Sequence, residues 1–379
     1  MNLKQLIFNL RLKSYKILPI KRNRIVFLSH LGKTYACNPR YLCEYIALNY
    51  PNKFDLVWIY DKVCSTPPSV PKGVRCIPFF SHKGLRAINS ARFIISNTRI
   101  SDAFFFEKRK GQVYIQTWHS SMRLKCIEAD ANLGEKYEAF ARRDSNKIDV
   151  ILSGGHFSSD IFKNSFWYTG QVLETGTPRI DWLKNMTKMS KQQIFAKAGL
   201  DTNYKYILYA PTFRKNNNTE SYNIDFAKLC ESLYKKFNCR WKVLFRLHPN
   251  LKGIIKPDAI AGNVIDMTEY DDIQELLAIS DILITDYSSS MFDAAFCDKI
   301  CILYAADLEN YLNNERNLYF SISDLPFPLA RTNDDLMEII RQFETKDYHF
   351  KLTEFMKTIG SCENGTACES ICKYILARI

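Results

Sequence analysis

The 379-residue sequence predicts an α/β protein built from two doubly wound, Rossmann-like domains. Short apolar runs alternate with longer amphipathic segments, which is typical of parallel sheets covered by helices on both faces. The runs form two sets, and the break between them contains Gly176-Thr177-Pro178 and Gly199-Leu200-Asp201. A chain of this length is also too long for one ordinary hydrophobic core. We therefore expect two domains, each with its own sheet.

The predicted strands follow one another along the chain at helix-length intervals. In the first set they are residues 24–29, 54–60, 74–79, 92–96, 113–117 and 150–153. In the second set they are residues 206–210, 242–246, 263–267, 281–285 and 299–304. The expected organisation is a basic amphipathic segment at 1–24, domains at 25–180 and 200–360, and a terminal helix at 361–379.

The composition is that of a soluble globular chain. Hydrophobic residues make up 46% of the sequence and charged residues 24%. No run approaches the roughly eighteen apolar residues of a membrane span, so we expect no transmembrane helix. We also expect no signal peptide, because basic residues such as Lys4 and Arg11 interrupt the N-terminal apolar residues. The 12 cysteines form no CxxC pair, which indicates reduced thiols in the cytoplasm.

Basic residues outnumber acidic ones, 52 to 40, for a formal net charge of +12. Such a surface attracts polyanions, anionic lipid or phosphate-bearing substrates. We do not expect a nucleic-acid partner, because the basic residues are spread along the chain and no zinc finger, basic zipper or aromatic sheet motif is found. The basic amphipathic segment at 1–24 either lies on an anionic membrane surface or packs as an ordinary helix.

Polar side chains follow four of the predicted strands. In open parallel sheets, ligands bind beyond the carboxyl ends of the strands. Each of the four strand ends bears His, Arg, Lys or clustered hydroxyl groups, which together are suited to hold two phosphates and a nearby base. The four segments are residues 117–125, 210–215, 246–250 and 286–290.

The most informative of these segments contains three consecutive serines, Ser288 to Ser290. The apolar run from Ile279 to Ile284 indicates a buried strand before it, and residues 291–296 indicate the start of a helix after it. The first N–H groups of a helix lack internal partners and carry the positive end of its dipole, so this turn suits a phosphate or diphosphate. Alternatively, the serines only cap the helix, with Ser290 and Asp293 approximating a capping box.

Five motifs, taken in order, resemble the CDP-glycerol glycerophosphotransferase family, the teichoic-acid priming and polymerising enzymes. The resemblance covers roughly residues 110–375. The chain departs from the family pattern at Ser120-Ser121, where the family has Gly-Thr, and by one extra residue before Lys125. The motifs are Trp118-His119-Ser120-Ser121-Met122-Arg123-Leu124-Lys125, Gly176-Thr177-Pro178-Arg179-Ile180-Asp181, Ala210-Pro211-Thr212-Phe213-Arg214, Arg246-Leu247-His248-Pro249, and Thr285 through Asp293.

The resemblance implies a GT-B arrangement, in which two Rossmann-like domains face a cleft, with the acceptor on the first domain and the nucleotide donor on the second. It implies transfer of a polyol phosphate, glycerol phosphate above all, from a CDP-polyol to a lipid-linked cell-wall or capsule glycan at the cytoplasmic membrane face. Alternatives are a glycosyltransferase or nucleotide-sugar epimerase of the same fold, or a non-catalytic scaffold of the polymer-synthesis machinery. No cofactor or metal is expected, because cationic side chains and a helix N-terminus can neutralise a diphosphate.

The same resemblance assigns residues to the two substrates. His119 is the candidate base for the acceptor hydroxyl, because histidine titrates near neutral pH; the alternative is a structural histidine at a strand end. His248 is the candidate that steadies the leaving CMP. His30, His82, His156 and His349 lie outside the motifs and are assigned no role. The turn at residues 153–159, which contains His156, either approaches the acceptor or is only a tight turn. Arg214 and Arg246 are candidates to clamp a phosphate, and the alternative for either is a surface ion pair. The remaining candidates are Trp118, Ser120 and Lys125 on the acceptor side, and Thr212, Asp286, Ser288, Ser289, Ser290 and Asp293 on the donor side.

Overall fold

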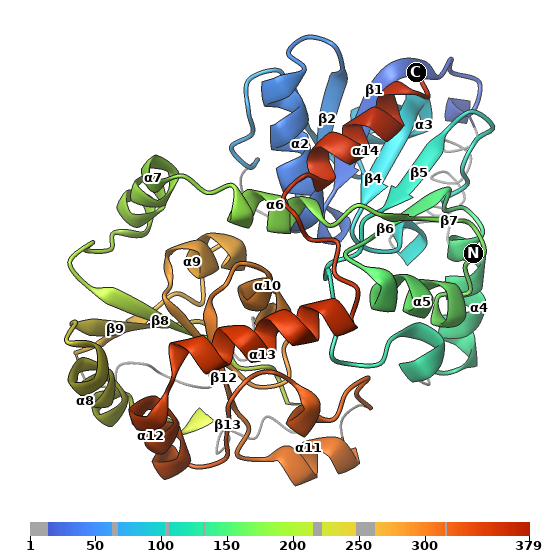
Figure 1. The fold of residues 1–379 in the computed structure, drawn as a ribbon. Coiled ribbons are helices and arrows are strands. Elements are labelled where there is room, and N and C mark those ends of the chain that lie inside the picture. Colours follow the sequence, from blue (N-terminus) through green and yellow to red (C-terminus); the bar gives the residue numbers. More distant parts are fainter. Residues whose placement is uncertain are drawn as a thin grey trace. The chain divides into compact units, whose positions relative to one another are not determined.

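The computed structural model describes residues 14–62, 67–102, 106–131, 133–214, 222–247, 262–314 and 317–379. These residues form two compact units (Figure 1). The first unit holds the described residues up to Ser121, with Ile127–Trp182 and Cys362–Ile379. The second holds Met122–Cys126 and Leu183–Ser361. The chain therefore leaves the first unit twice, once for a five-residue excursion and once for the whole second unit.

The sheet of the first unit is parallel throughout, with strand order β3-β2-β1-β4-β5-β6-β7. Strands β2 and β3 lie on one side of β1, and β4 to β7 follow on its other side, so the strand order reverses between β1 and β4, as in a doubly wound fold. The strands are β1 (Lys21–Leu28), β2 (Asp55–Tyr60), β3 (Val74–Pro78), β4 (Ala91–Ser96), β5 (Val113–Gln116), β6 (Val150–Ser153) and β7 (Gln171–Glu174).

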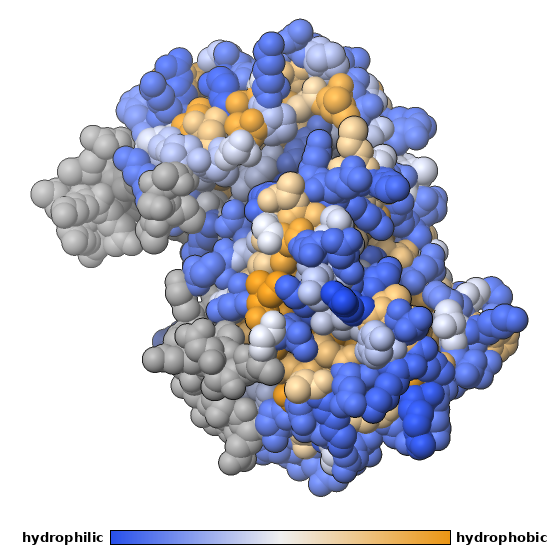
Figure 2. All heavy atoms as spheres, turned by 90° about the vertical axis from the view of Figure 1, so that its left-hand side faces the viewer, coloured by the Kyte–Doolittle hydropathy of each residue, from blue (hydrophilic) through white to orange (hydrophobic). Residues whose placement is uncertain are grey.

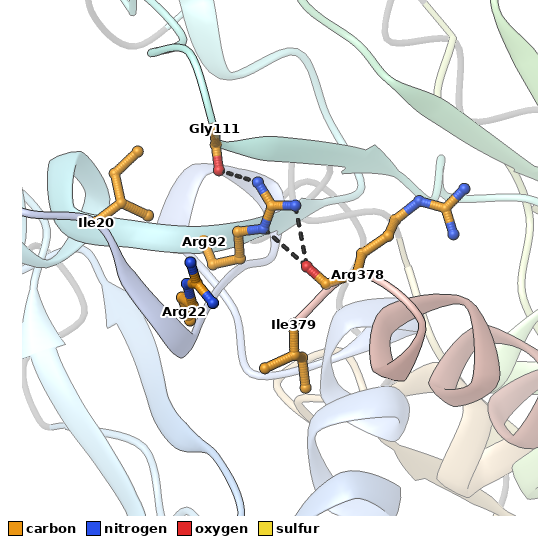
Figure 3. A pocket seen from close by; sticks show the side chains of 6 residues that line it. All are labelled: Ile20, Arg22, Arg92, Gly111, Arg378 and Ile379. Carbon is orange, nitrogen blue, oxygen red and sulfur yellow. Dashed lines mark hydrogen bonds between the residues drawn. The ribbon is translucent and has the colours of Figure 1, made fainter.

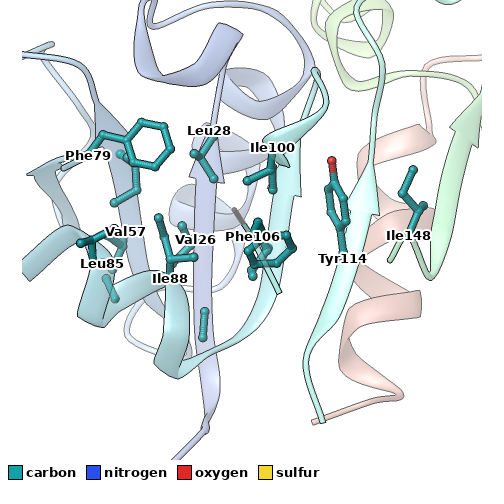
Figure 4. Close-up of a cluster of buried hydrophobic side chains, with 14 of the residues drawn as sticks. Val26, Leu28, Val57, Phe79, Leu85, Ile88, Ile100, Phe106, Tyr114 and Ile148 are labelled. Atoms are coloured by element: carbon teal, nitrogen blue, oxygen red, sulfur yellow. The ribbon is translucent and has the colours of Figure 1, made fainter. Parts of the chain in front are cut away.

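Both faces of this sheet are covered, because successive residues of its strands point to opposite sides. On one face, Val26 and Leu28 of β1 pack in a cluster with Leu85 and Ile88 of α3 (Figure 4). On the other face, the intervening strand residues pack against α2 and α14, which lie side by side at the blue and red ends of the chain in Figure 1. The helices of this unit are α2 (Cys37–Asn49), α3 (His82–Ser90), α4 (Glu135–Ser145), α5 (His156–Ser165) and α14 (Ala367–Leu376). Helix α6 (Pro178–Lys184) begins in this unit and ends in the second, because the boundary follows Trp182.

The sheet of the second unit is also parallel, with strand order β10-β9-β8-β11-β12-β13. Its reversal lies between β8 and β11. The strands are β8 (Lys205–Tyr209), β9 (Trp241–Phe245), β10 (Val264–Asp266), β11 (Ile282–Thr285), β12 (Ile300–Tyr304) and β13 (Leu329–Ala330). The helices are α7 (Lys188–Ala198), α8 (Phe226–Phe237), α9 (Ile273–Ile279), α10 (Ser290–Phe296), α11 (Leu308–Asn314), α12 (Asn333–Gln342) and α13 (Thr345–Thr358).

All eleven predicted strands are present, with ends that differ by three residues at most. Two further strands, β7 and β13, were not predicted; β7 is partly exposed, and β13 has only two residues. The predicted strand at Ile279 to Ile284 is wrong at its start, because Ile279 ends α9 and β11 begins at Ile282. Within the described residues, no helix combines the length and the apolar character needed to cross a bilayer. The face drawn in Figure 2 is mostly hydrophilic, with apolar residues in small patches.

Candidate functional site

The serine turn lies at the carboxyl end of β11, beside the reversal of strand order in the second unit. Ser288, Ser289 and Ser290 are half-buried, and the Ser290 hydroxyl donates to the Ser288 Oγ at 2.9 Å. The predicted capping box is wrong: helix α10 begins at Ser290, and its N-cap is Ser289, whose side chain makes no capping bond. Asp293 instead accepts a 2.9 Å hydrogen bond from Gln274 Nε2 of α9.

Asp286 joins the loops that follow β8 and β11. Its Oδ1 accepts hydrogen bonds from the backbone N–H of Thr212 at 2.9 Å and of Tyr287 at 2.6 Å. Its Oδ2 accepts from Arg214 Nη2 at 2.8 Å. One buried carboxylate therefore links the two loops at the point where the strand order reverses.

Arg214 forms a buried ion pair with two carboxylates. Its guanidinium lies between Asp286 and Asp307, and its remaining N–H groups donate to Thr212 O and Oγ1. All five N–H groups of Arg214 donate to protein atoms in this arrangement. Burial alone lowers the pKa of Arg214, but the hydrogen bond to Asp307 and the charge of Asp286 raise it above its ordinary value.

Arg246 follows β9 and is less completely satisfied. Its Nη2 donates to Tyr270 O at 3.2 Å, while its buried Nε has no partner among the described residues. Burial lowers the pKa of Arg246, and the charge of Asp272 opposes that shift. His248, the predicted partner of the leaving group, lies outside the described residues.

On the first unit, the loop after β5 carries Trp118 and His119. Trp118 adopts a left-handed backbone with φ of +50°, which non-glycine residues rarely do. Three hydrogen bonds hold this conformation: its N–H donates to Gln116 Oε1 at 2.9 Å, and its carbonyl accepts from Asn38 Nδ2 and Thr117 Oγ1, each at 3.0 Å. The buried indole meets Phe166 edge to face, and the His119 side chain next to it is exposed.

His119 is joined by a second histidine that the sequence interpretation set aside. The Nδ1 atom of His119 lies 3.3 Å from Asn97 O, and the ring centroids of His119 and His30 are 6.1 Å apart. His30 follows β1, Asn97 follows β4 and His119 follows β5, so three adjacent strands bring them together. The only sequence signal for His30 was its place directly after a buried strand.

Beneath this loop, Glu363 occupies a closed cradle. The Ser121 hydroxyl donates to Glu363 Oε1, and Thr177 donates through its N–H at 3.0 Å and its hydroxyl at 2.7 Å. Gly154 leaves no room here, because a Cβ at that position would lie 1.9 Å from the Ser121 Oγ. Burial raises the pKa of Glu363 to about 7. Glu363 lies outside the five motifs quoted above, so the sequence analysis did not identify it.

The Gly176–Asp181 motif anchors the surroundings of His119. Arg179 Nη1 donates to His119 O at 2.6 Å, and the Arg179 N–H donates to Asn38 Oδ1 at 3.1 Å. Asp181 accepts a 2.6 Å hydrogen bond from the Cys368 N–H in the first turn of α14. The motif therefore ties the His119 loop and the C-terminal segment to the same framework.

Lys125 belongs to the second unit, whereas Trp118 and Ser120 belong to the first. Ser120 is buried in the first unit, whereas residues 122–126 belong to the second. They do so because their backbone bonds to residues 317–319: Cys126 N–H donates to Asn317 O, and Tyr319 N–H donates to Leu124 O. Lys125 Nζ lies 5.4 Å from the ring centroid of Tyr311, which stacks on Tyr287 beside Arg214.

Two basic pockets flank the start of β1. One, about 420 Å³ in volume, contains Arg22 and Arg92; Figure 3 shows the Arg92 guanidinium donating to the carbonyls of Gly111 and Arg378. The other is about 250 Å³ and has five cationic side chains in its lining. Its lining residues are Leu18, Pro19, Lys21, Arg24, Arg75, Ile77, Lys83, Arg86, Ala87 and Ser90.

Comparison with known proteins supports one family. The model of the CDP-Glycerol:Poly(glycerophosphate) glycerophosphotransferase family matches residues 10–377. The chain is 29% identical over 378 residues to a teichoic acid poly(glycerol phosphate) polymerase of Bacillus subtilis, covering 95% of this chain and 50% of that protein. It is 30% identical over 380 residues to a teichoic acid glycerol-phosphate transferase of Staphylococcus aureus, covering 93% of each. The chain thus spans about half the length of the first relative.

A solved structure extends the likeness to the fold. A histidine variant of the wall teichoic acid polymerase TagF, soaked with CDPG, superimposes with a TM-score of 0.83 at 27% identity. The match covers 100% of this chain and 98% of that one. It confirms the predicted GT-B-like fold class, with its two parallel α/β sheets.

Glu363 predicts a specific pH dependence of stability. Its pKa is raised from 4.5 to about 7, so between these values the folded state keeps a proton that the unfolded state loses. The free energy of unfolding should therefore fall as pH rises through this window, by up to about 1.4 kcal/mol per pH unit. We expect urea unfolding of Glu363→Gln to lack this slope, with the exposed Glu354→Gln as control. Parallel curves for wild type and Glu363→Gln would contradict the assignment.

Proposed function

This chain belongs to the CDP-glycerol:poly(glycerophosphate) glycerophosphotransferase family, and we propose that it transfers a polyol phosphate from a CDP-polyol to a hydroxyl of a lipid-linked cell-wall or capsule glycan. Glycerol phosphate is the proposed group, because the relatives at 29% and 30% identity are named for poly(glycerol phosphate) and glycerol phosphate. The observation that carries the proposal is the family match over residues 10–377, which includes the histidine loop and the serine turn.

The donor diphosphate is proposed to bind at the serine turn. Ser288 to Ser290 offer hydroxyl groups and the N–H groups that begin α10, and these are suited to phosphate oxygens. The incompletely bonded Arg246 is a second candidate ligand, as a planar fork that matches phosphate geometry. Because Arg214 has no N–H to spare, we assign it, with Asp286 and Thr212, to positioning the loops. His248 is proposed to donate to the leaving CMP.

On the acceptor side, His119 is proposed as the general base. Its imidazole takes the proton of the acceptor hydroxyl, the oxygen attacks the polyol-bearing phosphorus, and the bond from phosphorus to the CMP oxygen breaks. A phosphodiester forms and CMP leaves. Trp118 and Ser120 hold the His119 loop, since both are buried beside an exposed imidazole. Lys125 is reassigned to the Tyr287–Tyr311 cluster of the second unit.

Product analysis tests this function. Incubation with CDP-glycerol or CDP-ribitol and a lipid-linked acceptor should release CMP and form a phosphodiester. His119→Ala should lower turnover by about 10²–10⁴-fold, because it removes the base, and leave donor binding near wild type. His82→Ala, another exposed histidine of the same unit, is the control. Release of UDP or isomerisation of a sugar would favour the glycosyltransferase or epimerase alternative, and inactivity with intact binding would favour a scaffold.

Donor affinity tests the serine turn. Replacing Ser289 and Ser290 together by alanine should weaken CDP-polyol binding by about 1–3 kcal/mol, the usual loss for hydrogen bonds to a charged group. Titration calorimetry measures the change. A matched control is Ser321→Ala with Ser323→Ala, a second pair of neighbouring serines in the same unit whose hydroxyls lie 2.7 Å apart. Unchanged affinity in the Ser289/Ser290 variant, with its fold intact, would place the diphosphate elsewhere.

We further propose that the protein binds the cytoplasmic face of the membrane peripherally, through its basic surface. The smaller basic pocket supports this, because Asp55 pairs with Arg24 and Arg75 while Lys83 and Arg86 form no ion pair in the described part of the chain. The amphipathic segment at 1–24 was the first indication of such a surface, and residues 18–24 contribute to both basic pockets. Its first 13 residues lie outside the described ranges.

Vesicle sedimentation tests the membrane proposal. Lys83→Glu with Arg86→Glu should weaken binding to phosphatidylglycerol vesicles, because each basic residue near an anionic surface adds about 1 kcal/mol. Added salt should weaken wild-type binding in the same way. Lys346→Glu with Lys351→Glu, on exposed positions of α13, changes the net charge equally and serves as control. Equal loss in both double variants, or equal sedimentation with neutral phosphatidylcholine vesicles, would rule out a localised basic surface.

A further inference from the structure

The reversal of strand order in the first unit brings His30 and Asn97 together. The loops after β1 and β4 leave the sheet edge there, and His119 follows the next strand, β5. Ligands of doubly wound sheets bind at such points. The backbone is strained on both sides of the reversal, because His30, Leu31 and Trp118 have φ values of +45°, +58° and +50°. Strain of this kind clusters at functional sites, so the arrangement of these side chains merits a chemical interpretation.

The amide of Asn97 can face His30 in one orientation only. The backbone N–H of His30 donates to Asn97 Oδ1 at 2.8 Å, and an N–H group cannot accept, so the amide oxygen must point to it. The amide nitrogen therefore faces His30 Nε2, at 3.1 Å. An amide nitrogen only donates, so Nε2 must accept. His30 is thereby neutral, with its proton on Nδ1.

The backbone carbonyl of Asn97 determines which ring nitrogen of His119 carries the proton. The carbonyl oxygen of Asn97 lies 3.3 Å from His119 Nδ1, and a carbonyl only accepts, so this nitrogen carries the proton. The lone pair of His119 is then on Nε2. Asn97 is fully buried and is held in place by its bond to the His30 backbone, so one rigid residue controls the tautomers of both rings.

We propose that Asn97 is the positioning residue of the acceptor site and that His30 is a second substrate-contacting residue there. In this arrangement His119 presents a basic Nε2 to the attacking hydroxyl. His30, which is half-exposed, donates from Nδ1–H to a neighbouring hydroxyl or phosphate oxygen of the same acceptor. This role rests on the proposed function.

A neutral His30 also suits the proposed role of His119. The two ring centroids are 6.1 Å apart, and a positive charge at that distance disfavours protonation of its neighbour. An imidazolium at His30 would thus make His119 a weaker base. By occupying Nε2 of His30 with a donor, Asn97 opposes that protonation while leaving a hydrogen-bond donor on the ring.

Nitrogen-15 NMR of the full-length protein, with labelled imidazole rings, tests the tautomers without any substrate. We expect the wild-type signals of His30 and His119 to show the Nδ1–H form, assigned by their loss in His30→Asn and His119→Asn. Asn97→Ala should release His30 from that form and leave His119 in it, because alanine removes the amide but keeps the backbone carbonyl. Asn97→Asp should favour the imidazolium at His30. Asn89→Ala, which removes another buried asparagine of this unit, should leave both signals unchanged. An Nε2–H form at either ring in the wild type would overturn the positioning role.

Acceptor kinetics test the contact made by His30. His30→Ala should raise the acceptor KM and lower kcat/KM by about tenfold or more, the cost of a lost hydrogen bond to a polar substrate group. His30→Asn keeps an amide donor near the Nδ1 position and should recover part of that loss. His82→Ala, elsewhere in the unit against Tyr15, is the control. An unchanged acceptor KM in His30→Ala would overturn the contact. Absence of CMP release by the wild type would instead overturn the proposed function. The NMR measurement of the two tautomers would still test the role of Asn97, because it needs no substrate.

Discussion

In each sheet the strand order reverses once, and the loops on the two sides of that point leave toward opposite faces. At such a point no helix covers the carboxyl ends of the strands, so polar side chains in the loops there can remain accessible. In the first unit the reversal carries His30 and Asn97, and in the second it carries Thr212 and Asp286. The placement of chemistry along this chain follows from that topological constraint.

Buried charged groups then give these loops their shape. Asp286 holds the loops after β8 and β11 together, and Arg214 neutralises it with the help of Asp307. In the first unit, Glu363 receives hydrogen bonds from Ser121 and Thr177. An isolated charge at such a position would be costly to bury, so Asp286 is paired with a cation, and burial raises the pKa of Glu363 to about 7. These loops are therefore held by internal hydrogen bonds and ion pairs.

The predictions from sequence succeeded where a signal is local. Continuous apolar runs such as Ile282–Thr285 identify buried parallel strands directly, because both faces of those strands are covered. They failed for β7, whose residues are partly exposed, and for the capping box, because Asp293 is bonded to Gln274 on another helix. The sequence also did not predict that the motif at residues 118–125 is divided between the two units. Residues 122–126 belong to the second unit because their backbone bonds to residues 317–319.

The sequence by itself determined the fold class, the family and the strand ends that carry polar and charged side chains, because hydrophobic periodicity and short motifs are local features of the sequence. Tertiary structure alone decided which groups meet. Ser121 bonds to Glu363 across 242 positions, and His119 reaches the backbone of Asn97 from 22 positions away. Strand order and burial decide which residues become neighbours. The distance between two residues in the sequence therefore does not predict whether they form a hydrogen bond. For this reason His30 was set aside as a histidine without a motif, although the reversal of strand order places it beside His119.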